Sequence, residues 1–224
     1  MNIDKIKVPA GWACVRYDNS NEFFKLGGSE FLLDISYEPE KNAQTSGIVV
    51  KICDNLIFSQ NNSNSHPYDV DIEVKKGDRV IFHFLTILQA KKEGKTFVQD
   101  GELYVFMPYE RMFVGISGDK VTPLNGYVLV EPVEQTLPDT ALIIPDTARG
   151  LSKTHGIVKY AGAKCRGYAG HLKHMGEDPD VNVGDMVVFN QVEAIPLQYE
   201  HHSILERNLY RMQRKDILAI LTAF

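Results

Sequence analysis

Side chains that can bind metal ions are concentrated between residues 165 and 178. Thiolate, imidazole and carboxylate groups are the usual protein ligands of zinc. Their spacing fits no zinc-binding pattern, however, and histidines in solvated loops are common, so we expect neither a metal site nor a cofactor. The adjacent histidines at 201 and 202 are a weaker candidate. The residues concerned are Cys165, His171, His174, Glu177 and Asp178.

A second candidate for chemistry is a phosphate-binding loop. Gly94-Lys95-Thr96 has the ending of a P-loop, in which the lysine contacts nucleotide phosphates. The first glycine of that motif is missing, because Gln89 stands in its place. The surrounding residues predict strand, turn and strand rather than strand, loop and helix. We therefore expect a hairpin turn at Lys91–Lys95 that binds no nucleotide.

Catalytic signatures are missing from the sequence. No Ser–His–Asp order, nucleophile elbow or pair of catalytic carboxylates can be placed. No dinucleotide-binding fingerprint is present either. We therefore expect a protein that is not an enzyme.

Composition limits the class of protein. The chain has 224 residues and a net charge of −5, with 24 Lys and Arg against 29 Asp and Glu, which argues against a nucleic-acid-binding protein. Three cysteines without CxxC spacing indicate a reducing compartment. The first residues lack the apolar region of a secretory signal, and no run is long enough to span a membrane. These features predict a cytoplasmic protein.

The strongest pattern in the sequence is an internal repeat. The segment Val74–His83 recurs as Val181–Asn190, with valine, glycine, aspartate, valine and phenylalanine at matching positions. Gly-Asp favours a tight turn, because glycine accepts positive φ and aspartate can bond nearby backbone. The β-branched and aromatic residues that follow predict a strand. Each copy is therefore interpreted as a turn that leads into a buried strand.

Other segments recur in the same order, which predicts two homologous domains, residues 1–119 and 120–224, joined by a linker at Ser117–Thr122. Many short strands, turns rich in Gly and Pro, and no convincing long amphipathic helix predict an all-β fold of barrels or sandwiches. The matched pairs are Gly11–Tyr17 with Gly126–Glu131, Gly47–Ile52 with Gly156–Tyr160, and Glu102–Ile116 with Asn208–Ile220. Further strands are expected at Arg79–Leu88, Leu103–Met107 and Arg111–Ile116.

The second half resembles the GroES (ten-kilodalton chaperonin) co-chaperonin family. Leu142-Ile-Ile-Pro-Asp-Thr-Ala148, the turn in Val181–Phe189 and the terminal Asp216–Ile220 carry the resemblance, which spans nearly all of residues 124–224. The first half looks like a diverged copy, and double-domain co-chaperonins are known in chloroplasts. The resemblance implies two tandem GroES-like irregular β-barrels that assemble into a homo-oligomeric ring.

The resemblance also implies a partner and a binding site. Family members cap a GroEL-type chaperonin in a nucleotide-dependent way, through a mobile loop whose three apolar residues dock in a groove on the chaperonin. On this sequence those residues are Leu142, Ile143 and Ile144, and the nearest equivalents in the first half are Phe31, Leu32 and Leu33, after Gly27-Gly28. The segment that forms the family's roof hairpin is enlarged in both halves, at Asp54–Asp71 and Ala163–Asp180.

Physical reasoning independently supports a binding loop, because apolar residues in a flexible surface loop need something to cover them. Burial of one leucine and two isoleucines could yield roughly 1.5–3 kcal/mol each, less the cost of ordering the loop. Several weak loops on one ring would bind tightly together. The alternative is that Leu142–Ile144 pack on their own barrel.

Other interpretations of the whole chain stay open. A structural or assembly protein could keep the barrels and lose chaperonin binding, and a metal-dependent enzyme would have to contain bound metal. Symmetry poses a further question, since family rings present seven loops to a seven-fold partner and two domains per chain cannot divide seven evenly. One domain of each chain could engage, single-domain subunits could join the ring, or sites could be left unfilled.

Overall fold

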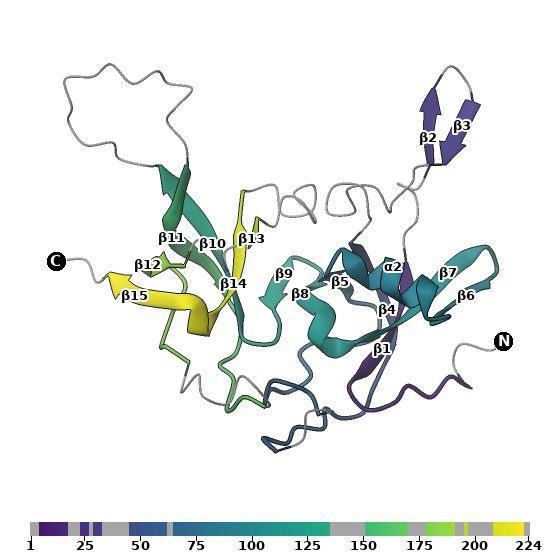
Figure 1. The fold of residues 1–224 in the computed structure, drawn as a ribbon, viewed down its shortest axis with the longest axis horizontal. Coiled ribbons are helices and arrows are strands. Elements are labelled where there is room, and N and C mark those ends of the chain that lie inside the picture. Colours follow the sequence, from purple (N-terminus) through teal and green to yellow (C-terminus); the bar gives the residue numbers. More distant parts are fainter. Residues whose placement is uncertain are drawn as a thin grey trace.

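Strands dominate the computed structural model of this protein (Figure 1). The structure describes residues 5–17, 45–61, 65–134, 151–169, 178–190 and 208–221 in full, and the backbone alone of 23–26, 29–32 and 195–196. Within these ranges the strands form two large antiparallel sheets, which confirms the expected all-β class with two β-domains. None of the described helices is long and apolar enough to cross a membrane.

The first sheet has seven strands in the order β6-β7-β1-β4-β5-β8-β9. One helix, α2 (Leu85–Lys92), lies in the connection from β5 to β6, and a 3-10 turn, η2 (Tyr109–Arg111), separates β7 from β8. The strands are β1 (Trp12–Tyr17), β4 (Ser46–Ile52), β5 (Arg79–Phe82), β6 (Thr96–Gln99), β7 (Glu102–Pro108), β8 (Met112–Ser117) and β9 (Lys120–Pro123).

The second sheet has six strands in the order β13-β14-β10-β11-β12-β15, and a 3-10 turn, η5 (Arg214–Asp216), separates β14 from β15. A separate hairpin of two strands, β2 (Phe23–Leu26) and β3 (Ser29–Leu32), belongs to neither large sheet. The strands of the second sheet are β10 (Tyr127–Glu134), β11 (Leu151–Ala161), β12 (Met186–Phe189), β13 (Ile195–Pro196), β14 (Tyr210–Gln213) and β15 (Ile217–Leu221).

The repeated Gly-Asp turn has the same geometry in both halves, as the sequence predicts. Gly77 and Gly184 have φ of 95° and 98°, in the left-handed region that side chains disfavour. The aspartate that follows each glycine accepts a hydrogen bond from the backbone N–H three residues before it, at 2.9 Å for Asp78 and 2.7 Å for Asp185. A strand begins directly after each turn, β5 in the first half and β12 in the second.

Five strands of each half share one order, β7-β1-β4-β5-β8 in the first sheet and β14-β10-β11-β12-β15 in the second. In both halves the turn glycine donates a 2.8 Å hydrogen bond to the neighbouring strand, at the carbonyls of Val49 and Val158. That neighbouring strand contains a glycine whose place no larger residue can take. An added Cβ would lie 2.4 Å from the Arg16 carbonyl oxygen at Gly47 and 2.6 Å from that of Glu131 at Gly156.

Two local predictions were wrong. The strand expected at Arg79–Leu88 ends at Phe82, because α2 begins at Leu85. The predicted turn at Lys91–Lys95 therefore follows a helix rather than a strand. Gly94 has φ of 67°, and the N–H of Lys95 bonds the carbonyl of Ala90 at 2.8 Å, which is the usual way that glycine ends a helix. The expected linker Ser117–Thr122 overlaps β9, which forms a hairpin with β8.

A separate apolar cluster stabilises each sheet. In the first, side chains of β1, β5 and β7 pack under α2, whose Ile87 and Ala90 face inwards. In the second, Val128, Val158 and Phe189 are central. Such burial contributes roughly 1.5–3 kcal/mol for each large apolar side chain, so each half contains a core of its own.

A third cluster joins the two halves. Phe113 of β8 packs with Leu129 and Leu209 of the second half, and the guanidinium of Arg211 lies 3.7 Å from the centre of the Phe113 ring. Contact between a cation and an aromatic ring adds to the apolar burial. The two sheets are therefore packed directly against each other.

Candidate functional site

The two loops expected to bind a partner leave equivalent places in the two sheets. In the first half the loop connects β1 to β4 and begins next to the Tyr17–Gly47 pair. In the second half it connects β10 to β11 and begins next to the Glu134–Leu151 pair. Each loop therefore links two neighbouring antiparallel strands at the same position in the shared strand order.

The loop of the second half extends from a projecting pair of strands (Figure 1). β11 pairs with β12 only at His155–Ile157, so Leu151–Thr154 lie beyond that pairing, and within this segment Leu151 pairs with Glu134 of β10. The hydroxyl of Ser152 stabilises this projection by accepting hydrogen bonds from the backbone N–H groups of Thr154 and His155, at 3.3 and 3.0 Å. The predicted contact residues Leu142, Ile143 and Ile144 lie outside the described residues.

The loop of the first half includes the β2–β3 hairpin. Phe31 and Leu32 are strand residues, paired with Phe24 and Phe23, while Leu33 lies outside the described residues. The sequence contained a signal for this hairpin, because Gly27-Gly28 between two short apolar runs is a typical hairpin connection. The structure describes the backbone of this hairpin and not its side chains.

The candidate metal ligands do not form a site within the described part of the chain. Burial, and then the nearby Asp178 carboxylate, raise the pKa of the Cys165 thiol to about 12, so the thiol stays protonated and is a poor metal ligand. Asp178 is itself engaged, since it accepts hydrogen bonds from the Cys165 backbone N–H and the Tyr168 hydroxyl. Among the described residues no three His, Cys, Asp or Glu side chains converge. His171, His174 and Glu177 lie outside the described residues.

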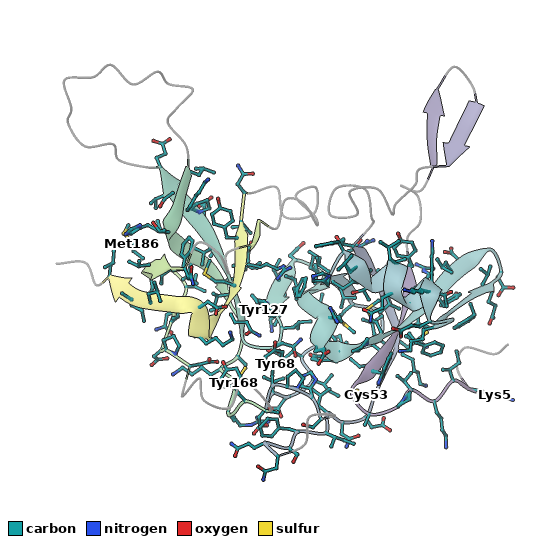
Figure 2. The ribbon with its side chains drawn as sticks, in the orientation of Figure 1. Lys5, Cys53, Tyr68, Tyr127, Tyr168 and Met186 are labelled. Atoms are coloured by element: carbon teal, nitrogen blue, oxygen red, sulfur yellow. The ribbon has the colours of Figure 1, made fainter. Side chains whose placement is uncertain are left out.

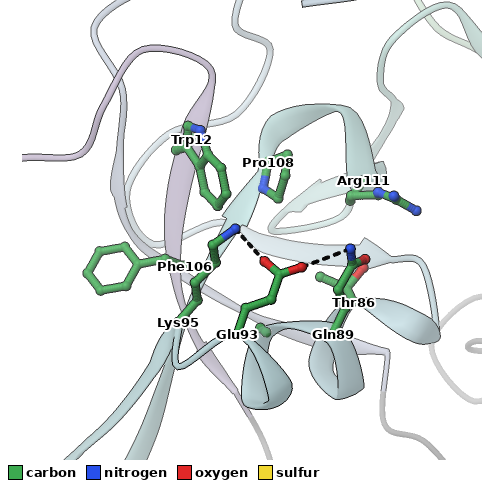
Figure 3. A pocket seen from close by; sticks show the side chains of 9 residues that line it. Trp12, Thr86, Gln89, Glu93, Lys95, Phe106, Pro108 and Arg111 are labelled. Carbon is green, nitrogen blue, oxygen red and sulfur yellow. Dashed lines mark hydrogen bonds and ion pairs between the residues drawn. The ribbon is translucent and has the colours of Figure 1, made fainter. Parts of the chain in front are cut away.

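A small pocket lies between α2 and strands β1 and β7 (Figure 3). Its cavity volume of about 60 Å³ has room for a few water molecules. Three of its polar side chains bind one another: Lys95 forms a 2.5 Å ion pair with Glu93, and Gln89 donates to the same carboxylate at 3.1 Å. The Lys95 ammonium also lies 4.6 Å from the centre of the Trp12 ring. Lys95, the lysine of the apparent P-loop, is therefore already bound to Glu93 and Trp12.

The enlarged loops of the two halves pack against each other. We call residues 66–71 and 163–169 the loop clasp. Three backbone hydrogen bonds of 2.9 Å join its two segments, and Tyr68 and Tyr168 form an isolated antiparallel β-bridge (Figure 2). The guanidinium of Arg166 binds the carboxylates of Asp69 and Asp71, each at 2.9 Å. The sequence contained a hint of this contact, namely two acidic residues in one enlarged loop and an arginine in the other.

A buried asparagine stands beside the loop clasp, between β9 and β10. Asn125 is fully buried with φ of 55°, and its side-chain amide donates to the carbonyls of Tyr109 and Met112 at 3.2 and 2.9 Å. Its side-chain oxygen lies 3.2 Å from Nε2 of His66. Burial lowers the pKa of His66, so this imidazole is neutral near pH 7. These side-chain hydrogen bonds of Asn125 therefore stabilise the connection between the two sheets.

Comparison with known proteins identifies the second half. Residues 120–221 match the sequence model of the family described as Chaperonin 10 Kd subunit. The chain is similar to the co-chaperonin GroES of Halothermothrix orenii, with 28% identity over 102 residues, which is 45% of this chain and 96% of that protein. It is also similar to the co-chaperonin GroES of Elusimicrobium minutum, with 29% identity over 101 residues, 45% of this chain and 94% of that protein. The C-terminal half of the chain therefore carries a domain of this non-enzymatic chaperonin family.

Proposed function

We propose that this protein is a cytoplasmic co-chaperonin that binds a GroEL-type chaperonin in a nucleotide-dependent way and caps its folding chamber. The family match over residues 120–221 carries this proposal, because it covers almost the whole length of two GroES relatives. Leu142, Ile143 and Ile144 are the proposed contact residues. Their segment connects β10 to β11 after the Glu134–Leu151 pair, at the place in the strand order where the β1–β4 connection stands in the first half.

The first half is proposed to be a diverged copy of the same domain, with the chain divided into residues 1–119 and 120–224. The shared order of five strands supports this division, and so do the matching hydrogen bonds of the Gly77 and Gly184 turns. Phe31, Leu32 and Leu33 are the proposed second contact. Two contacts on one chain would raise the apparent affinity through effective concentration, provided that both reach their grooves together.

A ring of identical chains would use the free edge of the second sheet. In the first half the outer edge of β8 is covered by β9, whereas the equivalent strand β15 is an edge strand without a neighbour among the described strands. Lys5–Val8 stands in the same position before Gly11 as β9 does before Gly126. We propose that this segment of one chain covers β15 of the next. Lys5 lies at the opposite end of the molecule from Met186 of the neighbouring strand β12, which suits a head-to-tail contact (Figure 2).

The test is size-exclusion chromatography with light scattering on a mixture of this protein and its host's GroEL-type chaperonin, with ATP, with ADP and without nucleotide. The combined change Leu142→Ser, Ile143→Ser and Ile144→Ser is the main variant. The same change at Phe31, Leu32 and Leu33 tests the second proposed contact separately. We expect nucleotide-dependent co-elution that the main variant abolishes. No co-elution of the intact protein would contradict the proposal.

A second candidate function is a structural or assembly protein that has lost chaperonin binding. The loop clasp favours it, because the segments that form roof hairpins in the family are joined to each other here. The two functions differ in the state of the segment Thr140–Arg149. A co-chaperonin should be cut there by protease and protected by chaperonin, whereas a structural protein should resist cleavage with or without chaperonin.

A further inference from the structure

The first sheet ends in a strand that has a neighbour on one side only among the described strands. This strand is β6, at the end of the molecule opposite β15 (Figure 1). Its residues, Thr-Phe-Val-Gln, include neither a charge nor a proline, and the side chain of Val98 is 69% exposed. Charged side chains and proline are common features that keep edge strands from pairing with other chains. β6 is therefore an unprotected edge.

The equivalent strand of the second half has such protection. β13 holds the same place beside β14 that β6 holds beside β7. It is only two residues long and contains Pro196, whose nitrogen cannot donate a hydrogen bond to a further strand. The two halves therefore differ at this edge, and only the first has a longer strand there without a proline.

The backbone of β6 has hydrogen-bonding groups directed to the free edge. The carbonyl of Lys95 accepts a 2.9 Å hydrogen bond from the N–H of Phe106, and the same register pairs Phe97 with Tyr104 of β7. In an antiparallel sheet alternate residues of a strand bond to the same neighbour. The N–H and C=O groups of Thr96 and Val98 therefore point away from β7.

We propose that β6 pairs with β6 of a second copy of this chain, antiparallel about a two-fold axis at Phe97. Thr96 of each copy then lies opposite Val98 of the other, and each of these pairs exchanges both of its backbone hydrogen bonds. The two Phe97 side chains face each other as a non-hydrogen-bonded pair, in which side chains are closest. Each Phe97 ring already stacks on Tyr104, with ring centres 5.0 Å apart, so the contact joins two aromatic rows.

The charges at the two ends of β6 favour this antiparallel contact. Three lysines and one glutamate occupy positions 91–95, before the strand, whereas Asp100 and Glu102 follow it. Antiparallel pairing brings the basic end of one strand next to the acidic end of the other, and parallel pairing would place like charges together. The contact is separate from the proposed ring contact at β15 and does not depend on chaperonin binding.

The first test is disulfide cross-linking of the full chain under mild oxidation. Phe97→Cys places two thiols at the axis, where Cα atoms about 4.5 Å apart are within the range of a disulfide, so we expect a covalent dimer. Thr96→Cys alone and Val98→Cys alone should not cross-link, because the same residue of the two copies is a diagonal neighbour about 7–8 Å away. The unaltered protein is the control, since Cys14, Cys53 and Cys165 are buried.

A mixture of Thr96→Cys chains with Val98→Cys chains should cross-link, because these positions lie opposite each other. The mixture keeps the Phe97 ring in place, so it decides the question if Phe97→Cys does not fold. No cross-link from the mixture, or a covalent dimer from Val98→Cys alone, would overturn the proposal. An edge that binds an extended peptide instead of a second copy would give no cross-link and would overturn it as well.

The second test is light scattering over a range of concentrations, with Leu218→Asp present in every chain to remove the proposed ring contact. Val98→Pro deletes a donor that points to the free edge and none within the sheet, so the fold is kept. It should weaken pairing at least about tenfold, because each copy loses one hydrogen bond. Val98→Ala keeps the donor and is the matched control, which should weaken pairing less. Equal weakening in these two variants would contradict the proposed hydrogen bonds and overturn the proposal.

Discussion

Replacement of Asn125 by alanine should strongly destabilise the junction between the halves. The change removes two donated hydrogen bonds and leaves the carbonyls of Tyr109 and Met112 without their partner, and it also removes the acceptor at 3.2 Å from His66. An unsatisfied buried polar group costs about 1–3 kcal/mol. Alanine at a φ of 55° adds about 1–2 kcal/mol of backbone strain. With water partly replacing the lost contacts, we expect a loss of about 3–5 kcal/mol.

Two further variants at the same position separate these contributions. Asn125→Gly loses the same hydrogen bonds without the strain, so it should be about 1–2 kcal/mol more stable than Asn125→Ala. Asn125→Asp keeps the shape but replaces the donating amide by a carboxylate facing two carbonyls, and it should be at least as destabilised as the alanine variant at pH 7.

The assay is urea unfolding followed by circular dichroism and by tryptophan fluorescence. Trp12 is the single tryptophan and lies in β1, so fluorescence reports on the first half while circular dichroism reports on both. Two domains need not unfold together, and separate midpoints would show loss of coupling. The reasoning is refuted if Asn125→Ala lies within about 0.5 kcal/mol of the unaltered protein, a shift typical of ordinary surface changes.

Four more predictions concern a strand glycine, a turn glycine, the loop clasp and the free edge. Gly156→Ala should destabilise the second half by at least about 1–3 kcal/mol in urea, because its Cβ would overlap backbone and Val130. Gly184→Ala has open space and should show only the strain of its φ of 98°, about 1–2 kcal/mol. Arg166→Gln should increase hydrogen exchange in the loop clasp with little change in the unfolding midpoint, since its ion pairs are exposed. Leu218 is 69% exposed on the edge strand β15, so Leu218→Asp should reduce self-association measured by light scattering. Leu85→Asp is the control, because Leu85 is an exposed leucine on α2, away from that edge, and its replacement should leave self-association unchanged.

The repeated turns were predictable from sequence because their cause is local. Gly77 and Asp78 specify a tight turn by their own backbone preferences, wherever the rest of the chain lies. The strand β5 follows from its β-branched and aromatic residues. The same residues recur at Gly184 and Asp185, so the same interpretation applies to both halves.

The helix α2 could not be recognised in the same way. Its eight residues follow a strand pattern without a proline or glycine between them, and its Leu85 is exposed while Ile87 and Ala90 are buried. That arrangement gives too short an apolar stripe to distinguish a helix from a strand. Burial of Ile87 and Ala90 against the first sheet, rather than local propensity, stabilises the helical conformation.

The junction depended on contacts between residues far apart in the chain. Glu73 meets Asn125 and Ala163, and Arg166 meets Asp69 and Asp71, at separations that no short motif spans. Charged residues in polar loops usually indicate solvated surface. Only the packing of the two sheets shows that these loops are partners and that the Glu73 carboxylate is half-buried between them.

The contact between the halves involves a position at which the two sheets differ. Phe113 of β8 is buried against Leu129 and Arg211, whereas Leu218 occupies the same place on β15 and is exposed. The larger aromatic ring fits a contact that is permanent within the chain, because it buries more area and stacks on the arginine. In the proposed ring, the smaller leucine would lie at a contact between separate chains, and it exposes less apolar area than phenylalanine would while the chains are apart. The two halves therefore differ most where one faces the inside of the chain and the other faces solvent.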